Sequence, residues 1–378
     1  MKIVLVHHYY YPVIGGLEIV VQNIAERLVK LGHEVHVVTS TYGAEGRSKE
    51  EIINNVYIHR IKARRIHFPD LMLPRDLPME LLKSADIIHI FSQNSLFNVV
   101  IGNTAKNLGR TVASYFLAVD SFSDHPNIIV RSLGSFYGKL CTLKALHFAD
   151  LKLVMGFRDM YILRKKYRVK DIIHVVPDGV PEKYFTLPRN TSNEFRKRYD
   201  IQKDFFLFIG RIHKLKGPHI IIKALRKIQE DIAGVFIGPD GGYLKECLKL
   251  ASDLGIKNKV HFLGYVDENI KISAIDSAIA VISPSLCNYA EIIPISIWEA
   301  WARGKPVIAS KVGDIPYRVK HGLNGLLFDP HNYNELAEHM VMLLKDQNLA
   351  NNLGENGRKQ VLTWEEIVAK IIKLYKII

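Results

Sequence analysis

The chain has 378 residues, of which 48% are hydrophobic and 24% charged, and these fractions are those of a globular protein long enough for two domains. Its formal net charge of +13 favours anionic partners such as nucleotides or phospholipids, and no nucleic-acid motif accompanies that charge. Three cysteines without a CxxC spacing disfavour a disulfide framework and a zinc site. This cysteine usage fits a reducing cytoplasm, where we expect the protein to be. No apolar run approaches the length of a membrane span, and peripheral contact at the inner face of an anionic membrane is a further hypothesis.

The first half of the chain alternates short apolar runs with a helical pattern. Residues 3–7, 34–39, 87–91 and 112–115 are predicted strands, and residues 17–31 carry apolar side chains at helical spacing. Gly15 and Gly16 open that helix, and their backbone N–H groups are expected to face a phosphate or an acceptor. The loop is not GxGxxG, and residues 39–41 lack the acidic residue of a nicotinamide binder, so a dehydrogenase is disfavoured.

The alternation of predicted strands and helices begins again after residues 177–181 and a polar stretch at 189–194. Predicted strands follow at 205–209, 234–238, 260–263, 278–283 and 307–310, with a helix at 218–229 and a closing amphipathic helix at 364–378. This pattern predicts an α/β protein of two doubly wound domains joined near residue 185. The loops after Ile209, Gly238 and Ser283 are expected to converge on one crevice, because ligands bind at the carboxyl ends of such strands.

A basic, glycine-containing turn follows the strand at 205–209. Gly210 and Gly217 allow the backbone to approach a ligand, while Arg211 and Lys216 place two cations at the edge of the sheet. A diphosphate is the natural ligand for such a pair, and an ordinary basic turn is the alternative. The GxxxxGK[ST] order of a P-loop is absent.

Two carboxylates, Glu291 and Glu299, stand eight positions apart around a predicted strand-to-helix turn. Pro294 suits the first helical position, and Gly304 with Pro306 suits the end of the helix. At about 3.6 residues per turn the two acids do not face each other, so they are expected to be separate acceptors near a helix N-terminus that attracts anions. Two solvated surface glutamates are the alternative.

Metal and nucleophile chemistry have no support in the sequence. No Asp-x-Asp triplet occurs, so we expect no metal to bridge a diphosphate. The histidines His7, His8, His89 and His125 are scattered and are expected to be structural. No Gly-x-Ser-x-Gly motif and no Cys/His pair indicates a nucleophile.

The ordered set of these motifs resembles the family 4 retaining glycosyltransferases of the GT-B fold. The residues that carry the resemblance are Pro12-x-x-Gly15-Gly16-x-Glu18, the 176–180 turn, Gly210-Arg211 with Lys216-Gly217, Gly238-Pro-Asp-Gly241, Pro284-Ser285, Glu291-x7-Glu299-Ala-x-Ala-x-Gly304-x-Pro306 and Val312-Gly313-x-Ile-Pro316. The resemblance implies two Rossmann-like domains facing a central cleft. The first, 1–185, would bind the acceptor, the second, 186–363, would bind a nucleotide sugar, and the helix at 364–378 would cross back onto the first.

The resemblance also implies roles for single residues. Arg211 and Lys216 would be catalytic, holding the diphosphate and stabilising charge on the leaving group, and Glu291 would accept from donor-sugar hydroxyls near the anomeric centre. Further donor-binding positions are Gly15, Gly16, Gly210, Ile292, Ile293, Pro294, Ile295 and Glu299, the last of these on the ribose. Many relatives carry a histidine after the strand that corresponds to 112–115; this chain does not, and Asp120 and Tyr115 are candidates to replace it.

The implied function is a hexosyltransferase that uses a UDP-, GDP- or ADP-sugar, needs no cofactor or metal, and acts on a glycan or lipid-linked hydroxyl. Residues 126–147 and 164–168 mix basic and apolar side chains, so a lipid-linked acceptor at an anionic membrane surface is a hypothesis, and solvated helix faces are the alternative. A non-catalytic nucleotide-sugar binder is the alternative suggested by the absent histidine. A GT-B epimerase is a third hypothesis.

Overall fold

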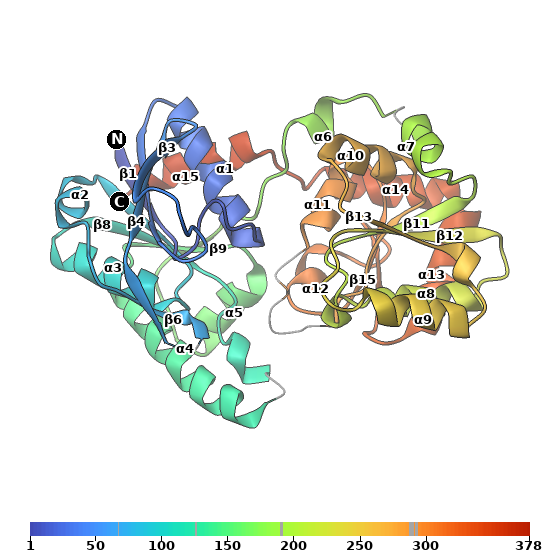
Figure 1. The fold of residues 1–378 in the computed structure, drawn as a ribbon, viewed down its shortest axis with the longest axis horizontal. Helices are drawn as coiled ribbons and strands as arrows, with labels where there is room; N and C mark the ends of the chain where they lie inside the picture. Colours follow the sequence, from blue (N-terminus) through green and yellow to red (C-terminus); the bar gives the residue numbers. More distant parts are fainter. Residues whose placement is uncertain (67, 125–126, 190–191, 287–290, 292–293) are drawn as a thin grey trace. The chain divides into compact units, whose positions relative to one another are not determined.

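The computed structural model describes residues 1–378 except 67, 125–126, 190–191, 287–290 and 292–293. Figure 1 shows two compact units: Met1–Asp178 with Trp364–Ile378 form unit 1, and Gly179–Thr363 form unit 2. The division falls earlier than the expected boundary after residue 185. The buried guanidinium of Arg303 donates hydrogen bonds to the carbonyl oxygens of Tyr184 and Leu187, at 2.9 and 2.8 Å, and thereby holds this segment in unit 2.

In the described part of the chain, unit 1 contains a sheet of eight strands. Its order is β10 (Ile173–Val175), β9 (Leu151–Val154), β8 (Thr111–Phe116), β7 (Ile87–Phe91), β1 (Lys2–Val6), β2 (Glu34–Ser40), β4 (Val56–Ile61) and β3 (Glu50–Ile53). The neighbouring strands are parallel apart from the antiparallel β3–β4 pair. The chain order reverses between β1 and β7, which is the point where ligands bind on doubly wound sheets.

Helices pack against the sheet of unit 1 and cover it (Figure 1). They are α1 (Gly16–Lys30), α2 (Met79–Ser84), α3 (Leu96–Asn107), η1 (Ser121–Asp124), α4 (Ile128–Phe148), α5 (Phe157–Lys165) and α15 (Trp364–Tyr375), and a separate hairpin is formed by β5 (Ala63–Ile66) and β6 (Phe68–Pro74).

The closing helix α15 is part of unit 1, where it packs beside α1 (Figure 1). Arg27 of α1 pairs with Glu365 at 2.8 Å, and the Tyr375 hydroxyl lies 2.5 Å from Nδ1 of the buried His89. Trp364, Ile367 and Ile371 are buried along the same face of α15. Its apolar side chains therefore serve the core of unit 1, which explains the amphipathic pattern at the end of the sequence.

Unit 2 contains, among its described residues, a parallel sheet of six strands. Its order is β13 (Val260–Gly264), β12 (Ile232–Ile237), β11 (Asp204–Ile209), β14 (Val281–Ser283), β15 (Val307–Ser310) and β16 (Leu326–Phe328). The helices are α6 (Lys183–Thr186), α7 (Ser192–Tyr199), η2 (Lys214–Lys216), α8 (Pro218–Lys227), α9 (Leu244–Asp253), η3 (Lys257–Lys259), α10 (Glu268–Ser277), α11 (Ile295–Ala302), α12 (Ile315–Arg318), α13 (Tyr333–Lys345) and α14 (Gln347–Arg358). The switch point lies between β11 and β14, as expected for a Rossmann-like unit.

The predicted elements are present with shifts of one or a few residues at their ends. Two ends differ by three residues: Ala278 caps α10, so β14 begins only at Val281, and α15 ends at Tyr375 instead of at residue 378. The sequence analysis found no elements between residues 50 and 74, where the structure has β3 to β6. Strand β5 carries the exposed Arg64 and Arg65, so it lacks the apolar run on which the prediction relied.

Candidate functional site

Glycines bring the ends of the central strands of unit 2 close together. Gly210 follows β11 with φ 157°, and Gly238 follows β12 with φ 142°. A Cβ atom on Gly238 would lie 2.0 Å from the carbonyl oxygen of Gly210, so a larger residue cannot replace it without moving the backbone. Arg211 directly follows Gly210, and its aliphatic stem lies over Gly241. It makes no hydrogen bond or ion pair with the described part of the chain. Its exposed guanidinium is available at the edge of the sheet.

A second glycine contact joins the loop after β11 to the loop after β14. Gly217 has φ 72°, and a Cβ atom there would lie 2.0 Å from the carbonyl oxygen of Pro284. The N–H of Leu286 also donates to the carbonyl of Leu215 at 2.8 Å. Lys216, between these contacts, is therefore fixed at the topological switch point of unit 2.

Glu291 is buried where these loops meet. Its carboxylate lies 2.7 Å from the Lys216 ammonium and accepts a hydrogen bond from the Ser285 hydroxyl. Its carbonyl oxygen accepts from the N–H of Asp314 at 3.1 Å, and a Cβ atom on Gly313 would lie 1.9 Å from that oxygen. A carboxylate that is 7% exposed needs such partners, because an unpaired buried charge is costly. The structure thus brings together two of the predicted catalytic residues and adds Ser285.

Glu299 occupies a different environment on α11. One carboxylate oxygen accepts from the Tyr184 hydroxyl at 3.0 Å and from the Lys271 ammonium at 2.5 Å, and the residue is 5% exposed. Burial, followed by the charge of Glu299, raises the pKa of Tyr184 well above its usual value, so the hydroxyl remains a donor. The sequence pattern indicates neither partner, and Tyr184 falls before the expected domain boundary at 185. The picture of two solvated glutamates is wrong for both acids.

The start of α11 differs by one residue from the prediction. Pro294 has ψ 131° and is the N-cap, so the helix begins at Ile295 and not at Pro294. Gly304, with φ 69°, follows the C-cap and ends the helix as predicted. The predicted positions Ile292 and Ile293 lie outside the described residues.

In unit 1 the predicted glycines open α1. Gly15 is the extended N-cap, and a Cβ atom on it would lie 2.2 Å from the Glu18 carboxylate, whereas a Cβ atom on Gly16 would meet nothing within 4 Å. His7 Nε2 lies 3.6 Å from Glu18. Burial raises the pKa of the Glu18 carboxyl, but its contacts with His7 act in the opposite direction and leave that pKa below its usual value. This His7–Glu18 pair at the end of β1 was missed by the sequence analysis.

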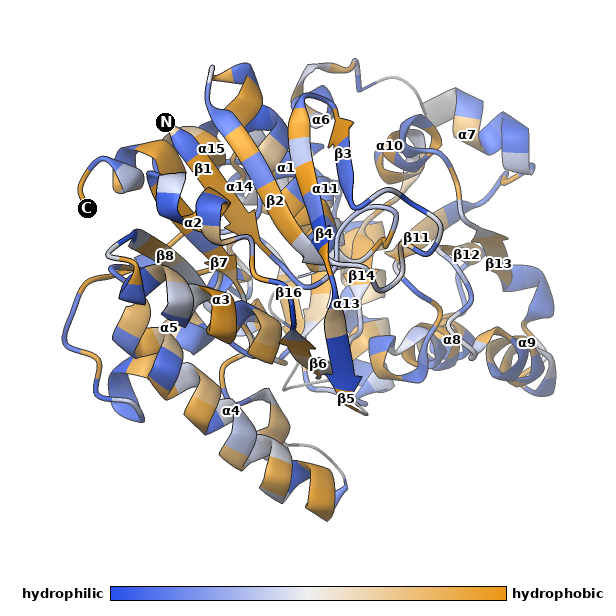
Figure 2. Cartoon of the chain, turned by 60° about the vertical axis from the view of Figure 1, so that its left-hand side comes forward, coloured by the Kyte–Doolittle hydropathy of each residue, from blue (hydrophilic) through white to orange (hydrophobic). Residues whose placement is uncertain are grey.

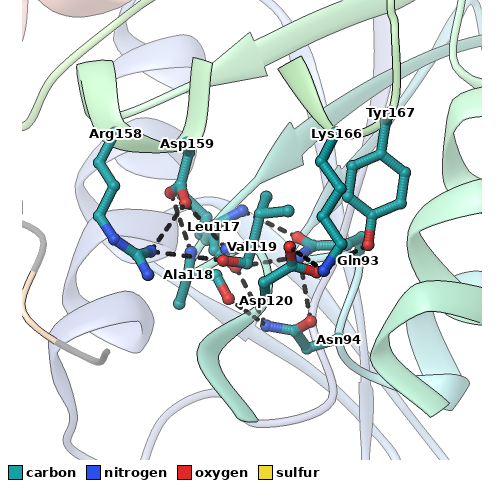
Figure 3. A network of polar contacts seen from close by, with 10 residues as sticks. All are labelled: Gln93, Asn94, Leu117, Ala118, Val119, Asp120, Arg158, Asp159, Lys166 and Tyr167. Carbon is teal, nitrogen blue, oxygen red and sulfur yellow. Dashed lines mark hydrogen bonds and ion pairs between the residues drawn. The ribbon is translucent and has the colours of Figure 1, made fainter. Parts of the chain in front are cut away.

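The loop after β8, where the family resemblance led us to expect a histidine, is held by a network of polar contacts (Figure 3). Asp120 pairs with Lys166 at 2.7 Å and accepts from the Tyr167 hydroxyl at 2.8 Å, and Tyr115 is buried with its hydroxyl on a backbone carbonyl. Both candidate replacements for the histidine are therefore already engaged within unit 1.

The same loop has an unusual backbone. Ala118 and Asp120 have φ values of 48° and 60°, in the left-handed region that non-glycine residues seldom adopt. The buried Asp159 carboxylate accepts from the N–H groups of Ala118 and Val119 at 2.9 and 2.8 Å (Figure 3). Asp159, from α5, is the group that secures this turn, and nothing in the local sequence pattern indicated it.

The remaining predictions concern ligands and membranes. Among the described residues, no group of three His, Cys, Asp or Glu side chains is placed to hold a metal ion. Cys141 and Cys247 are buried free thiols, while Cys287 and His125 lie outside the described residues. In the same part of the chain, no helix combines the length and the apolar character needed to cross a membrane.

Known families match both units. Glycosyltransferase Family 4 matches residues 14–184, and Glycosyl transferases group 1 matches residues 191–360. An uncharacterized glycosyltransferase of Methanocaldococcus jannaschii is 26% identical, over 100% of this chain and 98% of its own length. N-acetyl-alpha-D-glucosaminyl L-malate synthase of Bacillus anthracis is 24% identical, over 97% of this chain and 94% of its own length.

A solved structure shares the fold over the whole chain. Anabaena Alr3699/HepE in complex with UDP-glucose matches with a TM-score of 0.79 at 19% identity, covering 100% of both chains. With the two consecutive family matches and the two Rossmann-like units described above, the protein is a glycosyltransferase that belongs to family 4 and has the GT-B fold.

Proposed function

We propose that the protein transfers a hexosyl group from a nucleotide-diphospho-sugar to a hydroxyl acceptor, with retention of anomeric configuration and without a metal or cofactor. The observation that carries the proposal is the Lys216–Glu291–Ser285 cluster at the switch point of unit 2, with the exposed Arg211, which has no partner among the described residues, on the neighbouring loop. The buried Glu291 carboxylate can accept hydrogen bonds from hydroxyl groups, and the N–H groups of Lys216 and Arg211 can donate to phosphate, so the cluster suits a ligand that has both.

The cations of this site suit the diphosphate of the donor. The Lys216 ammonium has three N–H donors, and Glu291 takes one of them, so the others can bind phosphate oxygens. The Arg211 guanidinium offers a planar fork that fits phosphate in a bidentate manner. As the bond to the leaving diphosphate breaks, these charges would stabilise the negative charge that develops there, without a bridging metal.

The carboxylates suit the hydroxyl groups of the donor. Glu291 would accept from the sugar hydroxyls near the anomeric carbon, and the backbone N–H of Ile295, at the start of α11, would donate to the same sugar. Glu299 would accept from the ribose hydroxyls. One of its oxygens already binds Tyr184 and Lys271, so the ribose would use the remaining acceptor capacity of the carboxylate.

Retention follows if attack and departure occur on the same face of the sugar. The acceptor oxygen forms its bond to the anomeric carbon while the bond from that carbon to the phosphate oxygen breaks. The proton of the acceptor hydroxyl passes to the departing phosphate oxygen, so no separate base is required. Because the Anabaena protein was solved with UDP-glucose, a UDP-sugar is the first donor to examine, followed by GDP- and ADP-sugars.

The test is nucleotide release from a panel of UDP-, GDP- and ADP-sugars, with the anomeric configuration of the product read by NMR. Glu291→Gln and Arg211→Ala are each expected to lower turnover by roughly 10²- to 10³-fold. Glu246→Gln, an exposed carboxylate on α9, is the matched control and should behave as the wild type. Wild-type turnover in both site variants, or an inverted product, would contradict the proposal.

A second candidate function is a nucleotide-sugar binder without catalysis. It is favoured by the loop after β8, where the histidine of relatives is absent and Asp120 is engaged by Lys166 and Tyr167. This candidate predicts that UDP or GDP raises the melting temperature while no donor and acceptor pair releases nucleotide. Release of nucleotide that depends on Glu291 decides against it.

A further inference from the structure

Helix α4 exposes a line of large apolar side chains. Ile129, Leu133, Phe136, Leu140 and Leu143, here called the α4 stripe, are each 45–68% exposed. Their spacing of three or four residues places them on one side of the helix, at about 100° of rotation per residue. The stripe extends over about 21 Å, given a rise of about 1.5 Å per residue.

The core of unit 1 does not account for this stripe. The opposite side of α4 supplies the buried residues Gly138, Cys141, Ala145 and Phe148, and the Phe148 ring lies against Gly102 of α3. All of these buried positions belong to the second half of the helix. Figures 1 and 2 show the first half extending away from the sheet of unit 1, with apolar bands along it in Figure 2. Since a surface helix ordinarily has one apolar side, the second side needs a partner.

The charges of α4 identify the chemistry of that partner. Residues 128–148 contain no aspartate or glutamate but include Arg131, Lys139 and Lys144. Lys139 and Lys144 fall on opposite flanks of the stripe, at about 100° per residue. None of the three cations pairs with a carboxylate in the described part of the chain. A second copy of the helix would bring like charges together, whereas an anionic lipid surface would attract both flanks.

We propose that the α4 stripe docks unit 1 on an anionic phospholipid bilayer, with α4 lying in the plane of the headgroups. The apolar side chains would enter the boundary between headgroups and acyl chains, and Lys139 and Lys144 would reach the lipid phosphates. This docking goes beyond the proposed sugar transfer and does not depend on it, because none of the residues involved belongs to the site in unit 2.

The experiment is sedimentation of the full chain with vesicles of phosphatidylcholine alone and of phosphatidylcholine mixed with phosphatidylglycerol. The wild type is expected to sediment with the mixed vesicles at low salt and to be released as salt is raised, because salt screens the lysine charges. Phe136→Ser with Leu140→Ser should lower the apparent partition coefficient by about tenfold or more, since two large apolar side chains no longer leave water. Both positions are exposed, so the melting temperature should not change.

Ile172→Ser is the matched control, because Ile172 is a 72% exposed residue of unit 1 outside α4. It should bind vesicles as the wild type does. The proposal is overturned if the wild type stays in the supernatant with the mixed vesicles, or if the double variant binds as tightly as the wild type. It is also overturned if light scattering shows a wild-type dimer that the double variant converts to a monomer. An unchanged thermal shift with UDP in the double variant separates a failure of docking from a failure of donor binding.

Discussion

Replacing Lys216 by alanine tests whether this residue both supports the buried Glu291 and acts on a ligand. The ammonium lies 2.7 Å from the carboxylate, whose side chain is 6% exposed, while the Lys216 side chain is 42% exposed. A fully buried pair would lose about 3–5 kcal/mol on truncation, but solvent around Lys216 lowers our expectation to about 1–2 kcal/mol. For a unit of this size the loss corresponds to a melting temperature lower by roughly 2–8 °C.

The double variant Lys216→Ala with Glu291→Gln separates the two roles. A neutral amide does not leave a buried charge unpaired, so the double variant should recover most of the lost stability. Nucleotide release should not recover, because both groups that face the donor are then changed. Lys214→Ala is the matched control, since this exposed lysine lies in the same turn and makes no ion pair among the described residues.

The assays are calorimetric melting and nucleotide release with the donor that the screen identifies. Our reasoning requires a fall in stability for Lys216→Ala, a recovery in the double variant, and turnover reduced by roughly 10²- to 10³-fold in both. It would be refuted by a Lys216→Ala protein that melts with the wild type and retains its turnover. A double variant less stable than Lys216→Ala would refute the electrostatic explanation alone.

Two further predictions concern the loop after β8 and the junction between the units. Asp159→Ala leaves the N–H groups of Ala118 and Val119 without their acceptor, so the free energy of unfolding, measured by calorimetry, should fall by about 2–4 kcal/mol. Asp159→Asn should lose about half of that amount. A melting temperature within error of the wild type would contradict this role. Burial raises the pKa of Asp178 to about 6, and one of its oxygens is buried without a hydrogen-bond partner among the described residues. Because the folded-state pKa lies above the unfolded value, stability should fall as pH rises from about 4 to about 6. Asp178→Asn should therefore raise the melting temperature at pH 7.5, by the equivalent of about 1–3 kcal/mol, and should leave it nearly unchanged near pH 4. Equal gains at both pH values would contradict the assignment.

Much of the fold could be predicted because its determinants are local. The buried strands β1, β7 and β11 are continuous apolar runs, and α1 and α15 have apolar side chains at helical spacing. Strand β5, with its exposed arginines, had no such pattern and was not predicted. The two units divide after Asp178, before the expected boundary at 185, and the hydrogen bonds of Arg303 to residues 184–188, which hold that segment in unit 2, join positions more than a hundred residues apart.

The residues of the candidate site could also be predicted in part. The sequence by itself indicated Gly210, Arg211, Lys216 and Glu291 as polar or permissive residues in loops that follow strands, where a doubly wound sheet binds its ligands, and Glu299 on the helix after one of these loops.

Only the tertiary structure decided how those residues are engaged. It paired Lys216 with Glu291, joined Glu299 to Tyr184 and Lys271, and left the α4 stripe exposed. Spacing along the chain determines which side of a helix or strand a residue occupies. The partner of a buried charge depends instead on the order of the strands, because that order sets which distant loops lie side by side.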